Sequence, residues 1–223
     1  MKCGKSTLVG THGGKKSFFR LRCGSWDCPH CGPKRRARLK KQAYVGNPNS
    51  FLTLTINPQA FEDPASAARG LVISFRRMRE AICKRLSQRA IPFLAVFEAT
   101  KNGWPHLHIL MRCSYVDQKW LSDYMRRRID SPIVHIERIK SRKRLAVYIS
   151  KYVAKDPARF EGSKRTWRNQ RYLGPREKKP PSPWQWRLSA ATLEAWAWHT
   201  GCHESPEKPI PAEGFSTWEP VPP

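Results

Sequence analysis

Apolar and polar residues alternate in several short segments of this chain, and the alternation predicts the strands of a sheet. The clearest case is residues 51–56, which end at an Asn-Pro pair and are expected to form a central strand. Two apolar runs joined by a Lys-Asn-Gly turn predict a β-hairpin over residues 92–113. Residues 133–139 alternate again and predict a fourth strand.

Helices are predicted where apolar residues recur at spacings of three and four. Asp63, followed by proline, marks the start of the first helix. Its apolar stripe consists of Leu71, Phe75, Met78, Ile82 and Leu86. Further helices are expected over residues 117–129 and 141–155. The first helix is therefore expected to bury this stripe against the sheet, as core and not as a site.

The predicted hairpin carries two histidines, His106 and His108, separated by one apolar residue. Because side chains alternate along a strand, both imidazoles lie on one face and could hold one metal ion. They could equally be polar residues of a solvated face. Glu98, on the preceding strand, would complete a set of three ligands.

The hairpin register decides whether Glu98 can reach the histidines. A two-residue turn would pair Glu98 with Leu107, and the carboxylate would lie on the wrong face. A three-residue loop from Lys101 to Gly103, with Gly103 left-handed, would pair Glu98 with His106 instead. If Glu98 is a ligand, we therefore expect the three-residue loop.

The helix predicted over residues 141–155 gathers phenols and cations on one side. At about 100° per residue, this side holds Arg144, Tyr148, Lys151, Tyr152 and Lys155. Ordinary amphipathicity, with half-buried tyrosines, would give the same pattern. In a functional interpretation the phenols are nucleophiles, because a tyrosine with a pKa of about 10 ionises more readily beside Lys151 or a metal. Arg144 and Lys155 are then candidate DNA contacts.

Four cysteines near the start of the chain predict a structural zinc site. They are Cys3, Cys23, Cys28 and Cys31. Four thiolates suit a closed tetrahedral site, which would order a segment too poor in apolar residues to fold alone. Free thiols or a disulfide are the alternatives. Cys3 is remote in sequence, and His12 or His30 could take its place.

The chain is strongly basic, with 42 Lys and Arg against 17 Asp and Glu and a formal net charge of +25. Residues 1–179 hold 40 of these basic and 12 of these acidic residues. Interleaved Trp and Tyr residues favour a nucleic acid as the partner. A basic run after the cysteines, on a predicted helix, could contact phosphates or form only a solvated face. This run includes Lys34, Arg35, Arg36 and Arg38.

We expect a zinc-binding module with its basic helix over residues 1–46 and a main domain over residues 47–200. Within the main domain, residues 156–183 are rich in Arg, Lys, Pro and Gly and are expected to form a basic arm that orders on DNA. The proline-rich residues 201–223 are expected to be disordered. No apolar run of about 18 residues is present, so no membrane-spanning segment is predicted.

Three motifs, in this order, resemble those of the HUH endonucleases, specifically the rolling-circle replication initiators of small phages and plasmids. They are Phe51-Leu52-Thr53-Leu54-Thr55, Pro105-His106-Leu107-His108 and Tyr148-Ile149-Ser150-Lys151-Tyr152-Val153-Ala154-Lys155-Asp156. The resemblance covers about residues 50–156, and the cysteine cluster is similar to that of several such initiators.

The resemblance implies an α+β fold related to the RNA-recognition motif, a central antiparallel sheet flanked by helices. It implies that Glu98, His106 and His108 hold Mg or Mn, which polarises the scissile phosphate of single-stranded origin DNA. Tyr148 would attack, leaving a 5′-phosphotyrosine link and a free 3′-hydroxyl. Tyr152 resembles the second nucleophile of the two-tyrosine branch, although it could merely pack or bind DNA.

Two other functions share parts of this pattern. Two-tyrosine transposases carry the same motifs and a zinc module but are usually longer, and a non-catalytic zinc-knuckle regulator would use the histidines structurally. The chain contains no G-x-x-x-x-G-K-[ST] loop, so no helicase is attached. A host helicase and polymerase are therefore expected as partners, in the cytoplasm of a bacterial host.

Overall fold

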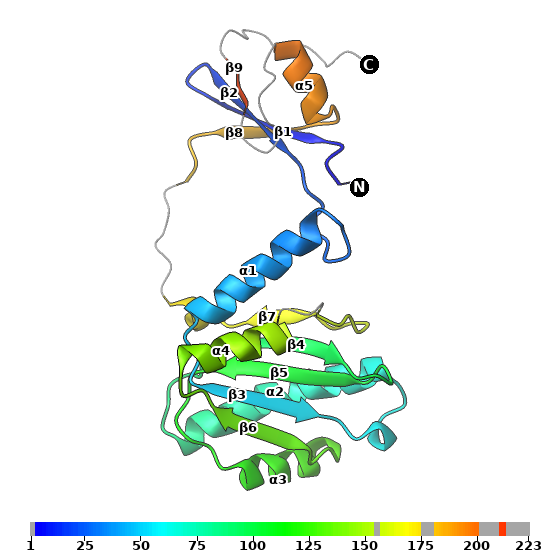
Figure 1. Cartoon of the computed structure of the whole chain (residues 1–223), viewed down its shortest axis with the longest axis vertical. Coiled ribbons are helices and arrows are strands. Elements are labelled where there is room, and N and C mark those ends of the chain that lie inside the picture. The colour runs from blue at the N-terminus through cyan, green and yellow to red at the C-terminus, as the bar shows by residue number, and fades with distance from the viewer. Residues whose placement is uncertain (1–2, 154–156, 175–180, 201–209, 213–223) are drawn as a thin grey trace. The chain divides into compact units, whose positions relative to one another are not determined.

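The computed structural model describes residues 3–153, 157–174, 181–200 and 210–212, and the chain divides into two compact units (Figure 1). Unit 1 combines residues 1–35 with residues 177–223, and unit 2 comprises residues 36–176. The boundary falls inside helix α1 (Cys31–Val45). Both ends of the chain therefore contribute to one unit, whereas we had expected residues 47–200 to form a single domain.

Unit 2 is built on a five-stranded sheet in which all paired strands are antiparallel, in the order β6-β3-β5-β4-β7. The strands are β3 (Ser50–Thr55), β4 (Phe93–Ala99), β5 (Pro105–Met111), β6 (Val134–Arg138) and β7 (Thr166–Arg168). The four strands predicted from the alternation are confirmed. The fold is α+β, because helices flank this sheet (Figure 1).

Helix α2 (Pro64–Arg85) covers one face of the sheet and forms the main core with it. Asp63 caps the helix through the backbone N–H groups of Ala65 and Ser66, as its position before proline predicted. Of the predicted apolar stripe, four residues are buried and Leu86 packs against them partly buried. The stripe contacts the sheet residues that alternate with the histidines, such as Leu107.

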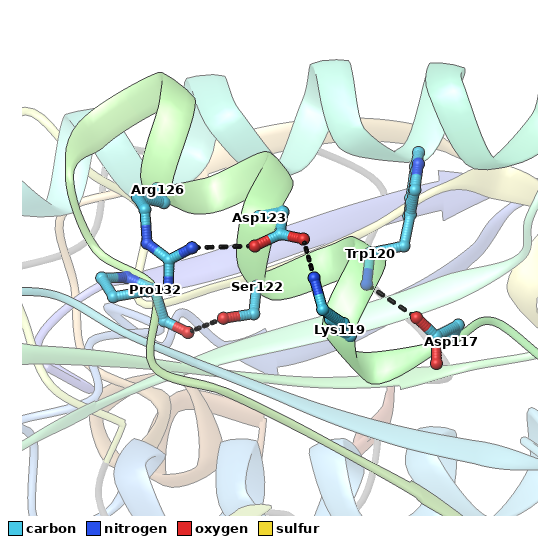
Figure 2. A network of polar contacts seen from close by, with 7 residues as sticks. All are labelled: Asp117, Lys119, Trp120, Ser122, Asp123, Arg126 and Pro132. Carbon is cyan, nitrogen blue, oxygen red and sulfur yellow. Dashed lines mark hydrogen bonds and ion pairs between the residues drawn. The ribbon is translucent and has the colours of Figure 1, made fainter.

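Helix α3 (Gln118–Ile129) packs near α2 and β6 and is fixed by polar contacts at both ends. Asp117 caps it by accepting a hydrogen bond from the backbone N–H of Trp120, at 2.8 Å (Figure 2). Asp123 accepts from Lys119 and Arg126, at 2.9 and 2.8 Å, and the Ser122 hydroxyl donates to the carbonyl of Pro132 (Figure 2). The last contact ties the helix to the segment that enters β6.

The opposite face of the sheet is covered by α4 (Arg142–Tyr148), which continues as a π-helical turn, Ile149–Val153. Ser141 caps α4 by accepting from the backbone N–H of Arg144. We expected one regular helix to residue 155, but the winding changes directly after Tyr148. π-helical turns inside helices are frequent at functional sites.

Residues 157–174 are ordered, although we expected this region to be part of a basic arm. β7 pairs with the edge of β4, and a 3-10 turn follows at Gln170–Leu173. Phe160 and Trp167 both contact Phe97, with ring centroids 5.4 Å apart in each case. These aromatic anchors explain the order, because they bury apolar surface that a solvated arm would expose.

Tyr172 is the strongest of these anchors and is fully buried. Its hydroxyl donates to the carbonyl of Ala43 at 3.0 Å, and its ring lies where a Cβ on Gly46 would stand. Arg112 donates to the carbonyls of Gly46, Arg171 and Tyr172. The end of α1 is thus joined to a segment far along the chain.

Unit 1 contains a four-stranded sheet in the order β8-β1-β2-β9, with helix α5 (Leu193–Thr200) packed on one face. The strands are β1 (Thr7–His12), β2 (Lys15–Arg20), β8 (Gln185–Ser189) and β9 (Ile210–Ala212). A small core of Val9, Phe18, Leu193 and Trp196 joins α5 to the sheet. β9 falls in the range expected to be disordered, and the rest of residues 201–223 lies outside the described residues. None of the described helices is both long and apolar enough to cross a membrane.

Candidate catalytic site

The β4–β5 hairpin has the register that we predicted for a Glu98 ligand. Glu98 pairs directly with His106 across the two strands. Gly103 is left-handed, with φ of 80°, and its backbone N–H donates to the carbonyl of Thr100 at 3.0 Å. The backbone N–H of Thr100 donates to the carbonyl of Trp104, which closes a three-residue loop. The carboxylate therefore lies on the same face as both histidines.

The sheet places the candidate site residues in rows on the face covered by α4. One row pairs Glu98 with His106, and the next pairs His108 with Thr53 of β3. A third row brings Phe51 of β3 opposite Glu137 of β6. The core residues point to the other face, so this face is free to carry chemistry.

His108 is held from both ring nitrogens and is only 4% exposed. Its Nε2 atom lies 2.7 Å from Oε2 of Glu98, and its Nδ1 atom lies 3.1 Å from the Thr53 hydroxyl. Because a carboxylate only accepts, Nε2 carries the proton in this contact. The Thr53 hydroxyl can donate or accept, so it fits either tautomer of the ring. The ring orientation is therefore fixed.

His106 lies beside His108, with ring centroids 6.2 Å apart and planes at 75°. Burial lowers the pKa of His106, the charge of nearby His108 lowers it further, and Glu98 acts in the opposite direction. A neutral imidazole has a lone pair available for a metal ion. Two imidazoles and a carboxylate are a chemically suitable donor set for Mn, and less so for Mg.

The ring of Phe51 lies at the centre of an aromatic cluster that joins the histidines to the tyrosines. Phe51 is stacked with His108, Tyr148 and Tyr152, at centroid distances of 5.6, 4.6 and 5.1 Å. The two tyrosine rings are themselves stacked at 6.3 Å. The structure thus brings both predicted nucleophiles and one predicted metal ligand onto a single ring.

Tyr152, and not Tyr148, is the tyrosine in direct ring contact with His108. Their centroids are 4.5 Å apart, with planes at 39°. The ammonium group of Lys151 lies 5.1 Å from the centroid of the Tyr152 ring. Lys151 is therefore next to the phenol that adjoins the histidines, as its candidate role requires.

Tyr148 is buried, and its hydroxyl faces β6 instead. Burial raises the pKa of Tyr148, and a hydrogen bond with Glu137 raises it further, whereas Arg144 opposes the change. Arg144 donates to Oε1 of Glu137 at 2.8 Å. Glu137 and Arg144 thus bind the hydroxyl that would otherwise act as a nucleophile. The two phenols therefore have different surroundings, although the sequence spacing alone made them look equivalent.

This arrangement lies within a segment that matches a known protein family. Residues 49–157 match the family model of the replication-associated protein ORF2. No curated protein and no solved structure matches the chain significantly. The matched segment, called the ORF2 segment below, contains β3, the β4–β5 hairpin and both tyrosines. It therefore includes every residue of the candidate site described above.

The cysteine cluster lies outside the ORF2 segment. The four thiols predicted as zinc ligands come together, with all Sγ atoms within 4.8 Å of one another. This confirms Cys3 as a member, whereas His12 and His30 are not part of the group. Among the described residues, no other set of three or more side chains is as compact a candidate for a metal ion. Four thiols at this spacing can hold one zinc ion.

The thiols also differ from one another in acidity. A hydrogen bond from the Cys23 backbone is the main cause that lowers the pKa of Cys3, to about 7. Burial is the main cause that raises the pKa of Cys31, to about 11. All four must lose their protons to bind zinc, so metal binding at this cluster releases protons.

The candidate DNA contacts lie in three places. The basic run occupies the first turns of α1, where the Arg35 guanidinium also lies over the Trp26 ring, 4.9 Å from its centroid. Arg144 lies on α4 and is ion-paired with Glu137. Lys155 lies outside the described residues. Of these, only Arg144 is placed beside the tyrosines by the described structure.

Proposed function

We propose that this chain initiates rolling-circle replication by nicking and rejoining single-stranded origin DNA through a 5′-phosphotyrosine intermediate. The observation that carries the proposal is the stack of Tyr148 and Tyr152 on Phe51, against His108. The match of the ORF2 segment to a family of replication-associated proteins supports the same function. The chemistry would be that of the two-tyrosine HUH endonucleases.

Glu98, His106 and His108 are the proposed ligands of the catalytic Mg or Mn. When bound, the ion would act as a Lewis acid on the scissile phosphate. His108 can ligate once its Nε2 proton is lost, and Nδ1 then donates to Thr53. No hydrogen bond to Thr53 is lost in this exchange, because a hydroxyl can also accept. The donor set fits the ion, and Thr53 supports it from behind.

Tyr152 is the proposed nucleophile of the first cleavage, because it contacts His108 and Lys151. Its phenolic oxygen forms a bond to phosphorus while the bond from phosphorus to the 3′ oxygen breaks. The phenol loses a proton in this step, and the 3′ oxygen gains one. The ammonium group of Lys151 stabilises negative charge that develops on the phenolic oxygen.

Tyr148 is the proposed second nucleophile, which cuts the regenerated origin while Tyr152 still holds the first end. Its hydroxyl must leave Glu137 before it can attack. The raised pKa of Tyr148 disfavours premature ionisation of this phenol. This order reverses the simplest expectation from the motif, in which the first tyrosine of the pair attacks first.

The test uses the full chain, Mn and labelled single-stranded DNA from its own replicon. A denaturing gel should show a protein–DNA adduct, which should disappear in His106→Ala and in the double variant Tyr148→Phe/Tyr152→Phe. DNA affinity without metal should remain in the double variant. Tight binding without any adduct from replicon-derived strands would favour the regulator function instead. The replication-associated family match favours initiation over transposition.

A further inference from the structure

The sheet of unit 1 has one face packed by α5 and another that carries exposed aromatic rings. Val9 and Phe18 point to α5. The residues that alternate with them point the other way, because cross-strand partners share a face. Phe19 pairs with Leu8, and Trp186 pairs with Gly10, on this second face.

Four rings follow one another on this face and are called the aromatic face below. His12 contacts Trp184 at 5.7 Å between ring centroids, Trp184 contacts Trp186 at 6.0 Å, and Trp186 contacts Phe19 at 5.3 Å. Phe19 and Trp186 are 40% and 38% exposed. The aromatic face is therefore a continuous row of rings that solvent can reach.

Gly10 allows the central ring to lie flat against the strand. A Cβ on Gly10 would stand 2.5 to 2.8 Å from three ring atoms of Trp186. Any larger residue would lift or displace the indole. One face of the indole is thus supported by backbone, which leaves its other face available to a planar ligand.

The charges around these rings favour an anionic ligand. Lys15 pairs with His12 and lies on the same face. In the described residues of unit 1, the acidic side chains are Asp27 and Glu194. Glu194 is ion-paired with Arg20 and belongs to α5, on the other side of the sheet. Among these residues, no carboxylate on the strands repels a phosphate from the aromatic face.

We infer that the aromatic face binds single-stranded nucleic acid by stacking unpaired bases, independently of base sequence. Exposed aromatic rings beside cations are the general means of binding single strands without sequence readout. The rings contact one another directly, so bases would stack on their outward faces and not between them. The inference concerns binding alone and adds a second DNA contact to the proposed nicking site of unit 2.

The experiment measures binding of the zinc-loaded full chain to two fluorescent strands, without divalent metal, by anisotropy. One strand is oligothymidylate of about 15 nucleotides, a length typical for such surfaces, and the other has the same phosphates but no bases. Trp186→Ala and Phe19→Ala should each weaken binding to the first strand on the order of 10-fold. Neither change should alter binding to the strand without bases. Gly10→Ala should act like Trp186→Ala, and Trp186→Phe should restore most of the affinity.

Tyr115→Ala is the matched control, because Tyr115 is an aromatic residue 78% exposed in unit 2 and outside the aromatic face. It should leave both affinities unchanged. Zinc content and thermal unfolding verify that each variant is folded. Equal losses on both strands, or no loss in Trp186→Ala and Phe19→Ala, would overturn the inference. So would a dimer of the unchanged chain that dissociates in Trp186→Ala, because the face would then bind a second copy.

The result is independent of the nicking proposal. Nicking is scored by the covalent adduct with Mn, and base stacking by the difference between two strands without Mn. Tyr152→Phe should lose the adduct and keep the difference between the strands. If the unchanged chain forms no adduct but prefers the strand with bases, only the nicking proposal fails.

Discussion

The two candidate metal sites differ in what their ligands do without an ion. In the cysteine cluster the four thiols already face one another within 4.8 Å. In the sheet of unit 2, His108 and Glu98 are instead joined by a hydrogen bond of 2.7 Å. Thiols are weak hydrogen-bonding groups, whereas imidazole and carboxylate satisfy each other well. The first site has little to displace when it binds its ion, and the second must exchange one partner for another.

This difference separates a permanent ion from an exchangeable one. A closed set of four thiolates is typical of structural zinc, and an open set with fewer protein ligands is typical of a catalytic ion. Unit 1 has only a small apolar core to support its fold without zinc. Unit 2 has an extensive core and should fold without its ion. Loss of zinc should therefore unfold a unit, and loss of Mn should stop only a reaction.

The largest expected effect comes from breaking the cysteine cluster. Cys28→Ser should abolish stable zinc binding and the cooperative unfolding of unit 1, because metal binding and folding are coupled in small metal-dependent units. Zinc content and protease resistance of residues 1–35 measure this. Cys83→Ser, which changes a thiol of unit 2, is the control and should retain zinc. A folded, zinc-loaded Cys28→Ser protein would contradict the structural role.

The next effect distinguishes the two tyrosines. Tyr152→Phe should reduce the first cleavage on the order of 10³-fold or more, because the substitution removes the nucleophile itself. Tyr148→Phe should preserve the first cleavage and lose the second transfer. Single-turnover gels with one origin strand, then with a second strand added, separate these steps. The opposite pattern would show that Tyr148 attacks first.

A smaller effect should follow from removing the hydroxyl behind His108. Thr53→Val keeps the shape of the side chain but leaves Nδ1 of His108 without its partner. Loss of such a supporting contact typically lowers metal affinity about 10- to 100-fold, so more Mn should be needed for half-maximal cleavage. Thr55→Val, on the same face and strand, is the matched control. Equal Mn requirements in both variants would remove Thr53 from the site.

The smallest expected effect concerns acid stability at the β6 end of the aromatic cluster. The pKa of Glu137 is lowered from its usual 4.5, first by the hydrogen bond from Tyr148 and then by Arg144. Its stabilising contribution is therefore present above about pH 4.5 and is lost as the pH falls through the lowered value. Glu137→Gln should flatten the fall in melting temperature between about pH 6 and pH 3. An unchanged slope would mean that this contact contributes nothing to stability.

The sequence predicted the candidate site well where a single hairpin determined it. Gly103 fixed the loop length, and the loop length fixed the pairing of Glu98 with His106. Thr53 was missed as a partner of His108, although it lies in a predicted strand. Its role depends on which strand pairs with β5, and a local pattern does not contain that information.

Long-range pairing also explains the differences in the fold. The strand β8 joins β1, although more than 170 residues separate them in the chain. Phe160, Trp167 and Tyr172 stand in a segment whose Arg, Lys, Pro and Gly content is typical of a solvated arm. Its burial depends on cavities formed by other elements, such as the space beside Gly46. Those cavities exist only after the rest of unit 2 has folded.

Tyr172 also has a consequence for the order of events on the ribosome. Its hydroxyl contacts a carbonyl 129 residues earlier in the chain. The end of α1 must therefore wait, with the space beside Gly46 unfilled, until both tyrosines of the candidate site have been synthesised. The last closure of unit 2 thus comes after its catalytic residues have emerged, and nascent chains that stop before Tyr172 should leave that space exposed to chaperones.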